Sequence, residues 1–576
     1  MEANDLIIRV GGEGGEGIIS TGDFIAKAAA RDGFHVLTFK TFPAEIKGGY
    51  AMYQTRMSSD ELLSEGDGFQ VLVVFNKEAL DVNRKFLKEG TVLVYDAPGG
   101  DINEEDVANL PGVTKYNIPM SEIAKHELQN YRSKNMVAMG AMTELFNLPR
   151  DTVKNLITEK FASKGDAVLN NNYAGFEAGQ NYARENHTKS DPFKLVDLGV
   201  EKDTIIISGN EAIGLGALVA GCNFFSCYPI TPATEVAIML SKHLPKANGK
   251  LVQAEDEIAS IANVIGASYA GAKAMTATSG PGVSLMLELL GLASIAELPV
   301  VVADVQRGGP STGLPTKHEQ SDLFIAAHGG HGDMSRIVLS PNNVADCFYL
   351  TIEAFNLAEK YQIPVLLLSD GSLGFRTETI HRPDLSKIET VDREIAKDGD
   401  PDFQRYKNTE SGISVMAVPG QSGLSHMATG LEHSEAGAPR YTPENHTMML
   451  EKRFRKIENV EDSLPPAEVQ GEADADVGVI AWGSTQGAVR EAVDRLIKKG
   501  KKVKALHPKL VWPVPVKAIN SFAEGVKTIL VPEVNFQGQF AELIKAATTI
   551  RPVKYNIYGG LPFMPENIER KIEELL

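Results

Sequence analysis

The sequence predicts a multidomain α/β protein, and three observations support that prediction. The chain has 576 residues, of which 43% are hydrophobic and 23% charged, as in ordinary globular proteins. A chain of this length exceeds what one hydrophobic core supports, so we expect about three to four domains. Short apolar runs alternate with helical segments and glycine-rich turns, which is typical of sheets covered by helices.

Charge and cysteine content exclude several function classes. The formal net charge is −18, so neither nucleic acid nor an anionic membrane surface is an expected partner. We find no secretory leader and no apolar stretch of about 18 residues, so we expect a cytoplasmic protein. The three cysteines, Cys222, Cys227 and Cys347, are too few for the thiolates of an iron–sulfur cluster. Any such cluster must lie on another chain.

The first domain is predicted over residues 1–195. Its strands are predicted at residues 6–10, 36–39, 71–75 and 92–95. The helical and turn segments between these runs are typical of a parallel sheet covered on both faces. A polar stretch at residues 170–193 is predicted to connect this domain to the next.

The stretch GGEGGEG at residues 11–17 follows the first predicted strand. Gly12, Gly14 and Gly17 fit G-x-G-x-x-G, the spacing of a loop whose backbone N–H groups face a phosphate. A nicotinamide dinucleotide also needs an acidic residue at the end of the next strand, but Lys40 stands there. Two interpretations remain open, a phosphate-approaching loop for another ligand and a plain strand-to-helix turn.

Three further segments follow. We place a second α/β domain at residues 196–385, an excursion or linker at residues 386–475 and a last α/β domain at residues 476–576. The second domain is predicted to open at residues 204–211 and to have buried strands at residues 274–278, 300–305 and 365–369. The excursion is polar and contains prolines, which argues against an independent core.

The densest candidate site is CYPITPATE at residues 227–235. Pro229 and Pro232 each fix φ and hold the backbone between them extended, which would aim Thr231 rigidly at a ligand. A plain turn is the alternative interpretation.

Two more segments have the character of ligand sites. Glu255, Asp256 and Glu257 precede a helix rich in small residues, where they are either dipole-complementing charges or functional carboxylates. The sequence TSGPG at residues 278–282 lies between a strand and a helix, so its backbone can face a ligand at the helix start.

A glycine-rich loop, RGGPSTGLPT at residues 307–316, follows the strand predicted at residues 300–305. Open α/β sheets bind ligands at the carboxyl ends of their strands. Arg307 suits a carboxylate because its planar guanidinium donates two parallel hydrogen bonds, and Thr312 and Thr316 add hydroxyls. A surface arginine in a flexible loop is the alternative.

Together these motifs resemble the α subunits of the 2-oxoacid:ferredoxin oxidoreductases, which are thiamine-diphosphate enzymes. The resemblance is carried by YPITPATE (228–235), ATSGPG (277–282) and RGGPSTGLPT (307–316). The glycine stretch and PAEIKGG (43–49) are similar to the family's γ domain. The resemblance covers essentially the whole chain. It implies a γ-type α/β domain, then a thiamine-diphosphate pyrimidine-binding fold, then a transketolase C-terminal-like α/β domain that shapes the site.

The resemblance also implies the site residues. Counted back from Gly266, Glu257 matches the catalytic carboxylate against the pyrimidine ring, with Glu255 as the alternative. The implied cofactor contacts are Glu257, Glu255, Pro229, Ile230, Ser279 and Gly280. The implied catalytic and substrate contacts are Thr231 and Arg307, with Thr312 and Thr316 as second contacts. The implied coenzyme A contacts are Gly12, Gly14, Gly17 and Lys47.

A β subunit is implied as the partner, in a dimer of αβ heterodimers. It would share thiamine diphosphate with this chain and carry Mg²⁺ and a 4Fe–4S cluster, and this chain is expected to bind no metal. Consistent with that division, Gly66-Asp67-Gly68 is not followed by the asparagine of a magnesium–diphosphate signature. The expected reaction is the coenzyme A-dependent oxidation of a 2-oxoacid with reduction of ferredoxin, and this chain alone should be inactive.

We expect 2-oxoglutarate as the substrate, rather than pyruvate or a branched-chain oxoacid. Its second carboxylate would need another cation, and Lys317, His318 and Arg376 are candidates. Two other functions remain as alternatives, a nicotinamide-dependent oxidoreductase and a scaffold subunit without catalysis.

Overall fold

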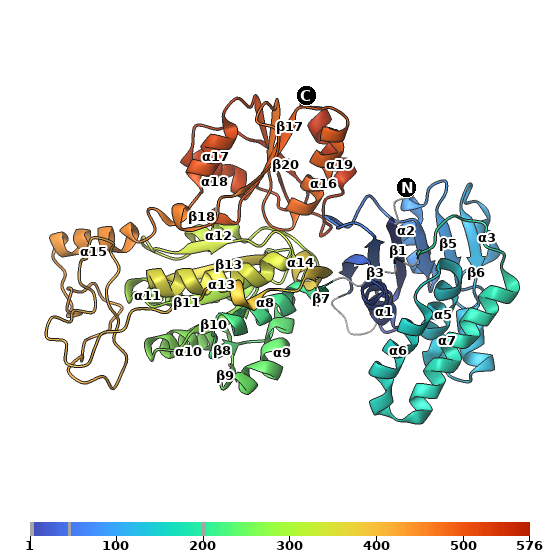
Figure 1. Cartoon of the computed structure of the whole chain (residues 1–576), viewed down its shortest axis with the longest axis horizontal. Coiled ribbons are helices and arrows are strands. Elements are labelled where there is room, and N and C mark those ends of the chain that lie inside the picture. The colour runs from blue at the N-terminus through green and yellow to red at the C-terminus, as the bar shows by residue number, and fades with distance from the viewer. Residues whose placement is uncertain (1–4, 44–47, 197, 199–202) are drawn as a thin grey trace. The chain divides into compact units, whose positions relative to one another are not determined.

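A computed structural model describes residues 5–43, 48–196, 198 and 203–576. The chain divides into two compact units (Figure 1). The first comprises Met1–Ile207 with Arg376–Arg382, and the second comprises Ser208–Phe375 with Pro383–Leu576. The structure has an eight-stranded, a seven-stranded and a five-stranded sheet. Within the described ranges no helix is long and apolar enough to cross a membrane.

The eight-stranded sheet has the order β6-β5-β4-β1-β3-β2-β14-β7. Its strands are β1 (Asp5–Glu13), β2 (His35–Thr41), β3 (Tyr50–Ser58), β4 (Val71–Val74), β5 (Val92–Tyr95), β6 (Thr114–Asn117), β7 (Thr204–Ser208) and β14 (Thr377–His381). β1, β4, β5 and β6 run parallel, but β3 is antiparallel to β1 and β2. The sheet is therefore mixed, and the prediction of a parallel sheet is correct for only part of it.

The sequence did not reveal β3 because polar residues interrupt its apolar pattern. Gln54 and Arg56 are buried in this strand, and each has a partner on β1. Arg9 Nη2 donates to Gln54 Oε1 at 2.6 Å, and Arg56 Nη2 pairs with Asp5 Oδ2 at 2.7 Å. Partners from a neighbouring strand make these polar residues compatible with burial.

Helices pack on this sheet. They are α1 (Ile18–Arg31), α2 (Lys77–Asn83), α3 (Glu104–Ala108), α4 (Met120–Glu122), α5 (Lys134–Phe146), α6 (Arg150–Phe161) and α7 (Asp166–Asn186), with short turns η1 (Arg84–Phe86), η2 (Ile123–Glu127), η3 (Tyr131–Ser133) and η4 (Ala162–Lys164). The prediction of a connecting stretch at residues 170–193 is wrong, because most of these residues form α7. α7 packs closely on α5, since a Cβ on Gly179 would lie 2.0 Å from the carbonyl oxygen of Val137.

The seven-stranded sheet has the order β18-β12-β13-β11-β10-β8-β9. Its strands are β8 (Phe224–Cys227), β9 (Lys250–Gln253), β10 (Ala274–Thr278), β11 (Val300–Gln306), β12 (Ile337–Leu339), β13 (Pro364–Asp370) and β18 (Leu510–Trp512), all parallel except β18. Its helices and turn are α8 (Gly209–Val219), α9 (Thr234–His243), η5 (Leu244–Ala247), α10 (Glu257–Tyr269), α11 (Gly280–Ile295), α12 (Leu323–His328), α13 (Val344–Tyr361) and α14 (Gly371–Phe375). The strand expected to open this domain, β7, pairs instead in the eight-stranded sheet.

The five-stranded sheet has the order β15-β17-β16-β19-β20. Its strands are β15 (Glu468–Gly471), β16 (Val477–Ile480), β17 (Val503–His507), β19 (Thr528–Glu533) and β20 (Val553–Asn556), and its helices are α16 (Thr485–Lys498), α17 (Val516–Ala523), α18 (Gln539–Ala547) and α19 (Pro565–Glu573). One core cluster joins this sheet to the seven-stranded one, because Trp482 and Phe540 pack in it together with Val338 and Leu366. β18, from the same part of the chain, extends the seven-stranded sheet. The two sheets therefore form one packed body.

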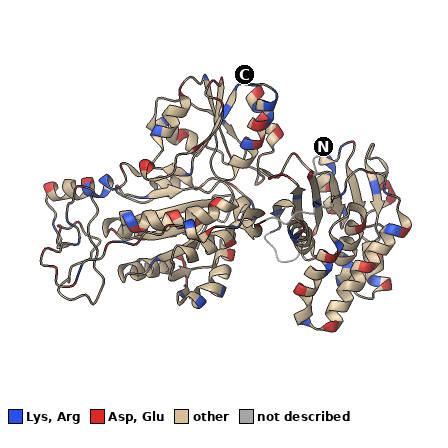
Figure 2. Ribbon diagram, in the orientation of Figure 1, with Lys and Arg blue, Asp and Glu red and all other residues tan. Residues whose placement is uncertain are grey.

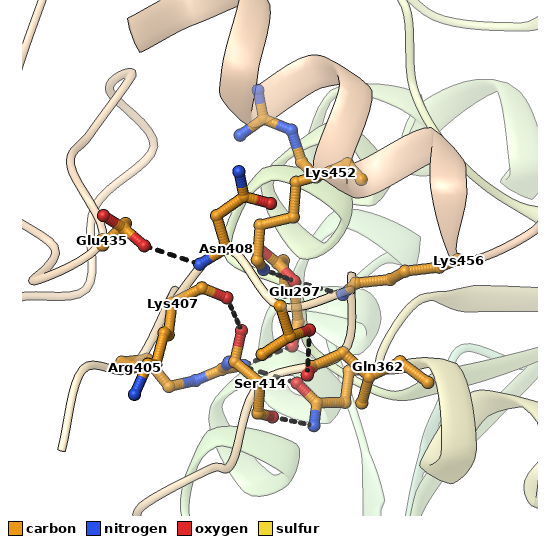
Figure 3. Close-up of polar contacts among 12 residues, drawn as sticks. Glu297, Gln362, Arg405, Lys407, Asn408, Ser414, Glu435, Lys452 and Lys456 are labelled. Carbon is orange, nitrogen blue, oxygen red and sulfur yellow. Dashed lines mark hydrogen bonds and ion pairs between the residues drawn. The ribbon is translucent and has the colours of Figure 1, made fainter. Parts of the chain in front are cut away.

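The excursion (residues 386–475) contains α15 (Pro443–Arg455), η7 (Val460–Ser463) and β15, preceded by η6 (Leu385–Lys387). A buried charge cluster holds it to the rest of the second unit (Figure 3). Glu297 is fully buried, Lys452 Nζ lies 2.7 Å from its Oε1, and Lys456 pairs with its other oxygen. Burial alone would raise the pKa of Glu297, but Lys456, Lys452 and Arg405 lower it to about 2.

Charged residues are spread over the helices of both units. Figure 2 shows Lys and Arg interspersed with Asp and Glu along these helices, whereas the strands are mostly uncharged. Positive and negative side chains are thus mixed on these helices.

Candidate active site

Three loops with predicted site residues start at the carboxyl ends of adjacent parallel strands, β8, β10 and β11. Residues 228–233 follow β8, residue 279 follows β10, and residues 307–322 follow β11. The carboxyl ends of adjacent parallel strands lie at one edge of the sheet, so the three loops meet there.

Arg307 links two of these loops. It is only 7% exposed, and its Nη1 donates to the carbonyl oxygen of Thr231 at 2.7 Å. Among the described residues, its buried Nε has no hydrogen-bond partner. Burial lowers the pKa of Arg307, while the charges of Asp322 and Glu257 raise it. Arg307 therefore lies within electrostatic reach of both acids, with a donor left for a ligand.

The structure separates the two candidate glutamates. Glu257 is the first residue of α10 and is 6% exposed, whereas Glu255 is exposed before the helix. Asp256 caps the helix by accepting from Ala259 N at 2.7 Å, so the capping role belongs to Asp256. A Cβ on Gly282 would lie 3.0 Å from Glu257 Oε1. Glu257 thus points toward the start of α11.

The start of α11 has room for neighbouring side chains because of its glycines. A Cβ on Gly280 would lie 2.6 Å from each carboxylate oxygen of Asp322, and a Cβ on Gly282 would lie 1.9 Å from Thr278 Oγ1. Ser279 precedes the helix, and within the described structure its buried hydroxyl has no hydrogen-bond partner. A buried donor without a partner beside a helix N-terminus is typical of a ligand site.

Sequence reasoning missed two acids at this edge, Asp304 and Asp322. Asp304 is fully buried in β11, opposite Thr278 of β10, and no described residue bonds either of its oxygens. Burial, with Asp322 nearby, raises the pKa of Asp304 well above its usual range. Burial and Glu319 raise the pKa of Asp322 to about 7, against the opposing effect of Arg307. The available signal was one acid inside the apolar run VVVADVQ.

The other predicted contacts lie around this cluster. Pro229 is exposed and Ile230 is half-buried. The carbonyl oxygen of Ile230 accepts from Ala233 N at 2.8 Å, which closes a turn after Pro229. In the arginine loop Thr312 is exposed and Thr316 is half-buried. The structure therefore brings Thr231, Glu257, Arg307, Ser279 and Gly280 to one edge of the sheet and leaves Thr312 at a solvent-exposed position.

Two of the three candidate cations already have carboxylate partners. His318 Nδ1 lies 3.2 Å from Asp370 Oδ1, and Arg376 Nη2 lies 2.5 Å from Glu65 Oε1 in the first unit. Lys317 belongs to the arginine loop, where its carbonyl oxygen accepts from Gly308 N at 3.0 Å. Burial lowers the pKa of Lys317.

The glycine stretch of the first unit contains an acid of its own. β1 continues through Glu13, so only residues 14–17 form the turn into α1. Glu16 accepts from Glu13 N at 2.8 Å and pairs with the buried Lys134 at 2.9 Å. The strand adjacent to β1 on one side is the antiparallel β3, unlike the parallel arrangement of a dinucleotide fold. Lys47 lies outside the described residues.

Family models match nearly all of the chain. Residues 7–182 match pyruvate ferredoxin/flavodoxin oxidoreductase. Residues 215–452 match the thiamine-diphosphate-binding part of pyruvate flavodoxin/ferredoxin oxidoreductase, and residues 475–568 match core domain II of pyruvate:ferredoxin oxidoreductase.

Two relatives match along nearly the whole chain, and a third matches about two thirds of it. The 2-oxoglutarate oxidoreductase subunit KorA of Mycobacterium tuberculosis is 33% identical, over 99% of this chain and 92% of that protein. The 2-oxoacid:ferredoxin oxidoreductase 2 subunit alpha of Aeropyrum pernix is 30% identical, over 99% of this chain and 98% of its own. The 2-oxoglutarate synthase subunit KorA of Methanothermobacter marburgensis is 40% identical, over 64% of this chain and 97% of its own.

A solved structure is similar over the same extent. The 2-oxoglutarate:ferredoxin oxidoreductase from Magnetococcus marinus, with 2-oxoglutarate, coenzyme A and succinyl-CoA bound, superimposes with a TM-score of 0.95 and 57% identity. The match covers 99% of each chain. With its site motifs, its three sheets and these likenesses along its length, the chain belongs to the family of 2-oxoacid:ferredoxin oxidoreductase α subunits.

Proposed function

We propose that this chain is the α subunit of a 2-oxoglutarate:ferredoxin oxidoreductase. The reaction converts 2-oxoglutarate and coenzyme A to succinyl-CoA and carbon dioxide with reduction of ferredoxin, and the same residues serve the reverse carboxylation. One observation carries the choice of substrate: the structure that shares 57% of its residues with this chain, over 99% of both chains, contains 2-oxoglutarate, coenzyme A and succinyl-CoA.

The residues at the start of α11 fit the aminopyrimidine half of thiamine diphosphate. Gly280 and Gly282 leave open backbone, Ser279 has an unpaired buried hydroxyl, and Glu257 points toward the same place. When bound, the cofactor supplies the nucleophilic carbon and the electron sink for decarboxylation. Glu257 would hold a proton at the pyrimidine N1′, while Pro229 and Ile230 would border the ring from the loop after β8.

Arg307 and Thr231 would hold the oxoacid. The hydrogen bond to the carbonyl oxygen of Thr231 orients the guanidinium, and the free Nε donor remains for a carboxylate oxygen of the substrate. Thr312 and Thr316 would add contacts from the same loop. For the second carboxylate of 2-oxoglutarate we choose Lys317, because it belongs to the same loop as Arg307, as the hydrogen bond from Gly308 N to its carbonyl oxygen shows.

Coenzyme A would approach the glycine stretch of the first unit. Gly12, Gly14, Gly17 and Lys47 are the proposed contacts. Glu16 occupies the N–H of Glu13, and the N–H groups of Gly14 and Glu16 donate to Gly49 O and Glu13 O, so the approach would use the N–H groups of Gly15 and Gly17. The double variant Gly14→Asp, Lys47→Glu should raise the KM for coenzyme A in the assembled enzyme, and an unchanged KM would exclude this site.

A β subunit would supply the diphosphate-binding domain, Mg²⁺ and the 4Fe–4S cluster, in a dimer of αβ heterodimers that reduces ferredoxin. The cysteines of this chain support that division. Cys222, Cys227 and Cys347 are all buried, and burial raises the pKa of Cys222 to about 12 and that of Cys227 to about 11. A single cluster normally takes four cysteine thiolates, and this chain has three cysteines.

The test uses the chain co-purified with its β subunit. Coenzyme A-dependent reduction of ferredoxin or of a viologen dye is measured with 2-oxoglutarate, pyruvate and a branched-chain 2-oxoacid. We expect the highest kcat/KM with 2-oxoglutarate and no activity from this chain alone. A higher kcat/KM with either other oxoacid would refute the proposed substrate.

A further inference from the structure

Gln320 fastens the segment after the arginine loop to the five-stranded sheet. It is fully buried, and both its side-chain amide and its backbone are hydrogen-bonded to that part of the chain. Its Nε2 donates to Trp482 O at 2.9 Å, and its Oε1 accepts from Val534 N at 3.0 Å. Its backbone N donates to Val534 O at 2.7 Å, and its carbonyl oxygen accepts from Asn535 Nδ2 at 2.9 Å.

Gln539, the first residue of α18, holds the chain on both sides of Asp322. Its Nε2 donates to Ser321 O at 2.8 Å, and its Oε1 accepts from Phe324 N at 2.9 Å. Together, Gln320 and Gln539 hold the backbone of residues 320–324 by hydrogen bonds. This segment includes Asp322, whose carboxylate lies against Gly280 at the start of α11.

Hydrogen bonds also connect the residues of the five-stranded sheet and of α18 that contact Gln320. Asn535 Oδ1 accepts from Gly538 N at 2.6 Å, and its Nδ2 also donates to Glu533 Oε2 at 3.0 Å. Glu533 is fully buried and accepts from Phe540 N at 2.9 Å and Ala541 N at 3.0 Å. Gln320 is thus attached to the end of β19 and the start of α18, where little movement is possible.

The contacts continue from this segment to Arg307. Asp322 N donates to Gln306 Oε1 at 3.0 Å, and Gln306 Nε2 donates to Ser369 O at 3.0 Å. Gln306 precedes Arg307, which donates to Thr231 O. Gln306 therefore connects the backbone of Asp322 to the residue before Arg307, and the opposite charges of Asp322 and Arg307 act on each other.

We propose that Gln320 is a positioning residue that sets the affinity of the enzyme for its 2-oxoacid. By holding the backbone around Asp322, Gln320 keeps this acid at the start of α11 and away from the guanidinium of Arg307. If Asp322 turned toward Arg307, it would compete with the substrate carboxylate for the same donors. The inference rests on the proposed role of Arg307 in binding the oxoacid. It gives the five-stranded sheet an indirect part in substrate binding, through the segment that contains Asp322.

The test compares two glutamine variants in the assembled α–β enzyme. Gln320→Leu should raise the KM for 2-oxoglutarate about tenfold, the scale of one to two lost hydrogen bonds, and leave the KM for coenzyme A unchanged. Gln362→Leu is the matched control. Gln362 is 1% exposed, and its side chain also makes two hydrogen bonds, to Arg405 at 3.1 Å and Ser414 at 2.6 Å, in the excursion. The control should lose stability without a change in KM.

The result that would overturn the inference is an unchanged oxoacid KM in Gln320→Leu, or an equal rise in both variants. If Gln320→Leu does not fold, the oxoacid KM of Gln539→Leu is measured instead, because Gln539 holds the same segment by separate hydrogen bonds. The same rise in KM is then expected, and an unchanged KM would overturn the inference. Arg307→Ala in the same assay separates the two proposals. If Arg307→Ala leaves the oxoacid KM unchanged, the proposed role of Arg307 is wrong. If Arg307→Ala raises the KM and neither glutamine variant does, only the role of Gln320 is wrong.

Discussion

Glu297 and Asp304 are both fully buried acids of the second unit, yet their surroundings shift their pKa values in opposite directions. Glu297 lies between Lys452 and Lys456, with Arg405 nearby, and has a pKa of about 2 (Figure 3). Asp304 has no hydrogen-bond partner among the described residues, and burial raises its pKa. One acid is part of a completed ion-pair cluster, and the other is left without compensation.

The difference distinguishes buried polar groups that are paired within the protein from buried polar groups that are available to a ligand. The cluster at Glu297 joins two distant segments of the chain, and both oxygens of its carboxylate are paired with lysines, so we assign it a structural role. The edge around Asp304 contains an unpaired Ser279 hydroxyl and a free Nε on Arg307. Folding tolerates such groups where a ligand completes them, which is why we place the cofactor and substrate there.

The largest effect that would sharpen this comparison is expected from Glu257→Gln. The amide cannot exchange a proton with the pyrimidine ring, so kcat should fall by about 10²-fold to 10⁴-fold while the protein folds normally. Steady-state kinetics of the αβ enzyme and its thiamine diphosphate content are measured together. Glu255→Gln, at the exposed neighbouring acid, is the control and should keep its activity. Full activity of Glu257→Gln with cofactor bound would refute the assignment.

Glu297→Gln should affect stability and leave the chemistry intact. Loss of the carboxylate leaves buried lysines unpaired, so the free energy of unfolding should fall by about 3–5 kcal/mol. Denaturant unfolding measures this change, with the exposed Glu410→Gln as the control. The pKa of Glu297, about 2, lies below its ordinary value of 4.5, so its stabilisation is complete above that value and lost as the pH falls toward 2. A raised oxoacid KM in Glu297→Gln would contradict the separation drawn above.

Arg307→Ala should lower activity and leave stability nearly unchanged, the reverse of Glu297→Gln. Loss of a charged hydrogen bond of roughly 3 kcal/mol should lower kcat/KM for the oxoacid by on the order of 10²-fold, mainly through KM. The unfolding midpoint should change little, because the variant removes a buried cation whose own pKa is lowered by burial. Arg551→Ala, at an exposed arginine, serves as the control. An unchanged kcat/KM would exclude the carboxylate-binding role.

The smallest effect is expected from Asp322→Asn, and it concerns pH. The pKa of Asp322, about 7, lies above its ordinary value of 3.8, so its neutral form favours the fold and this contribution is lost as the pH rises through 7. Above that pH the charged carboxylate weakens the attraction of Arg307 for the substrate carboxylate, so the oxoacid KM of the unmodified enzyme should rise. Asp322→Asn should flatten this rise. The same pH profile in both proteins would show that another group causes it.

The sequence by itself determined the family, the α/β class and most of the central strands. The buried strands β10, β11 and β13 read as short apolar runs, and the motifs around Ser279 and Arg307 follow β10 and β11 as predicted. These features can be predicted from the sequence because they depend on residues that are close along the chain. They follow from side-chain periodicity, from proline and glycine geometry, and from the order of strand, loop and helix.

Only the tertiary structure decided which polar residues are buried and what they contact. β3 was missed because its buried polar residues have partners on β1, and α7 was missed because most of its polar residues are exposed on a helix that packs on α5. β7 joins a sheet built mostly from an earlier part of the chain. Glu297 pairs with Lys452, and Gln320 accepts a hydrogen bond from Val534 N, although the partners are far apart in the sequence. The favourable energy of such pairs depends on distance and desolvation in the folded protein. No local pattern records either quantity, so the roles of Asp304, Asp322 and Gln320 became apparent only in the fold.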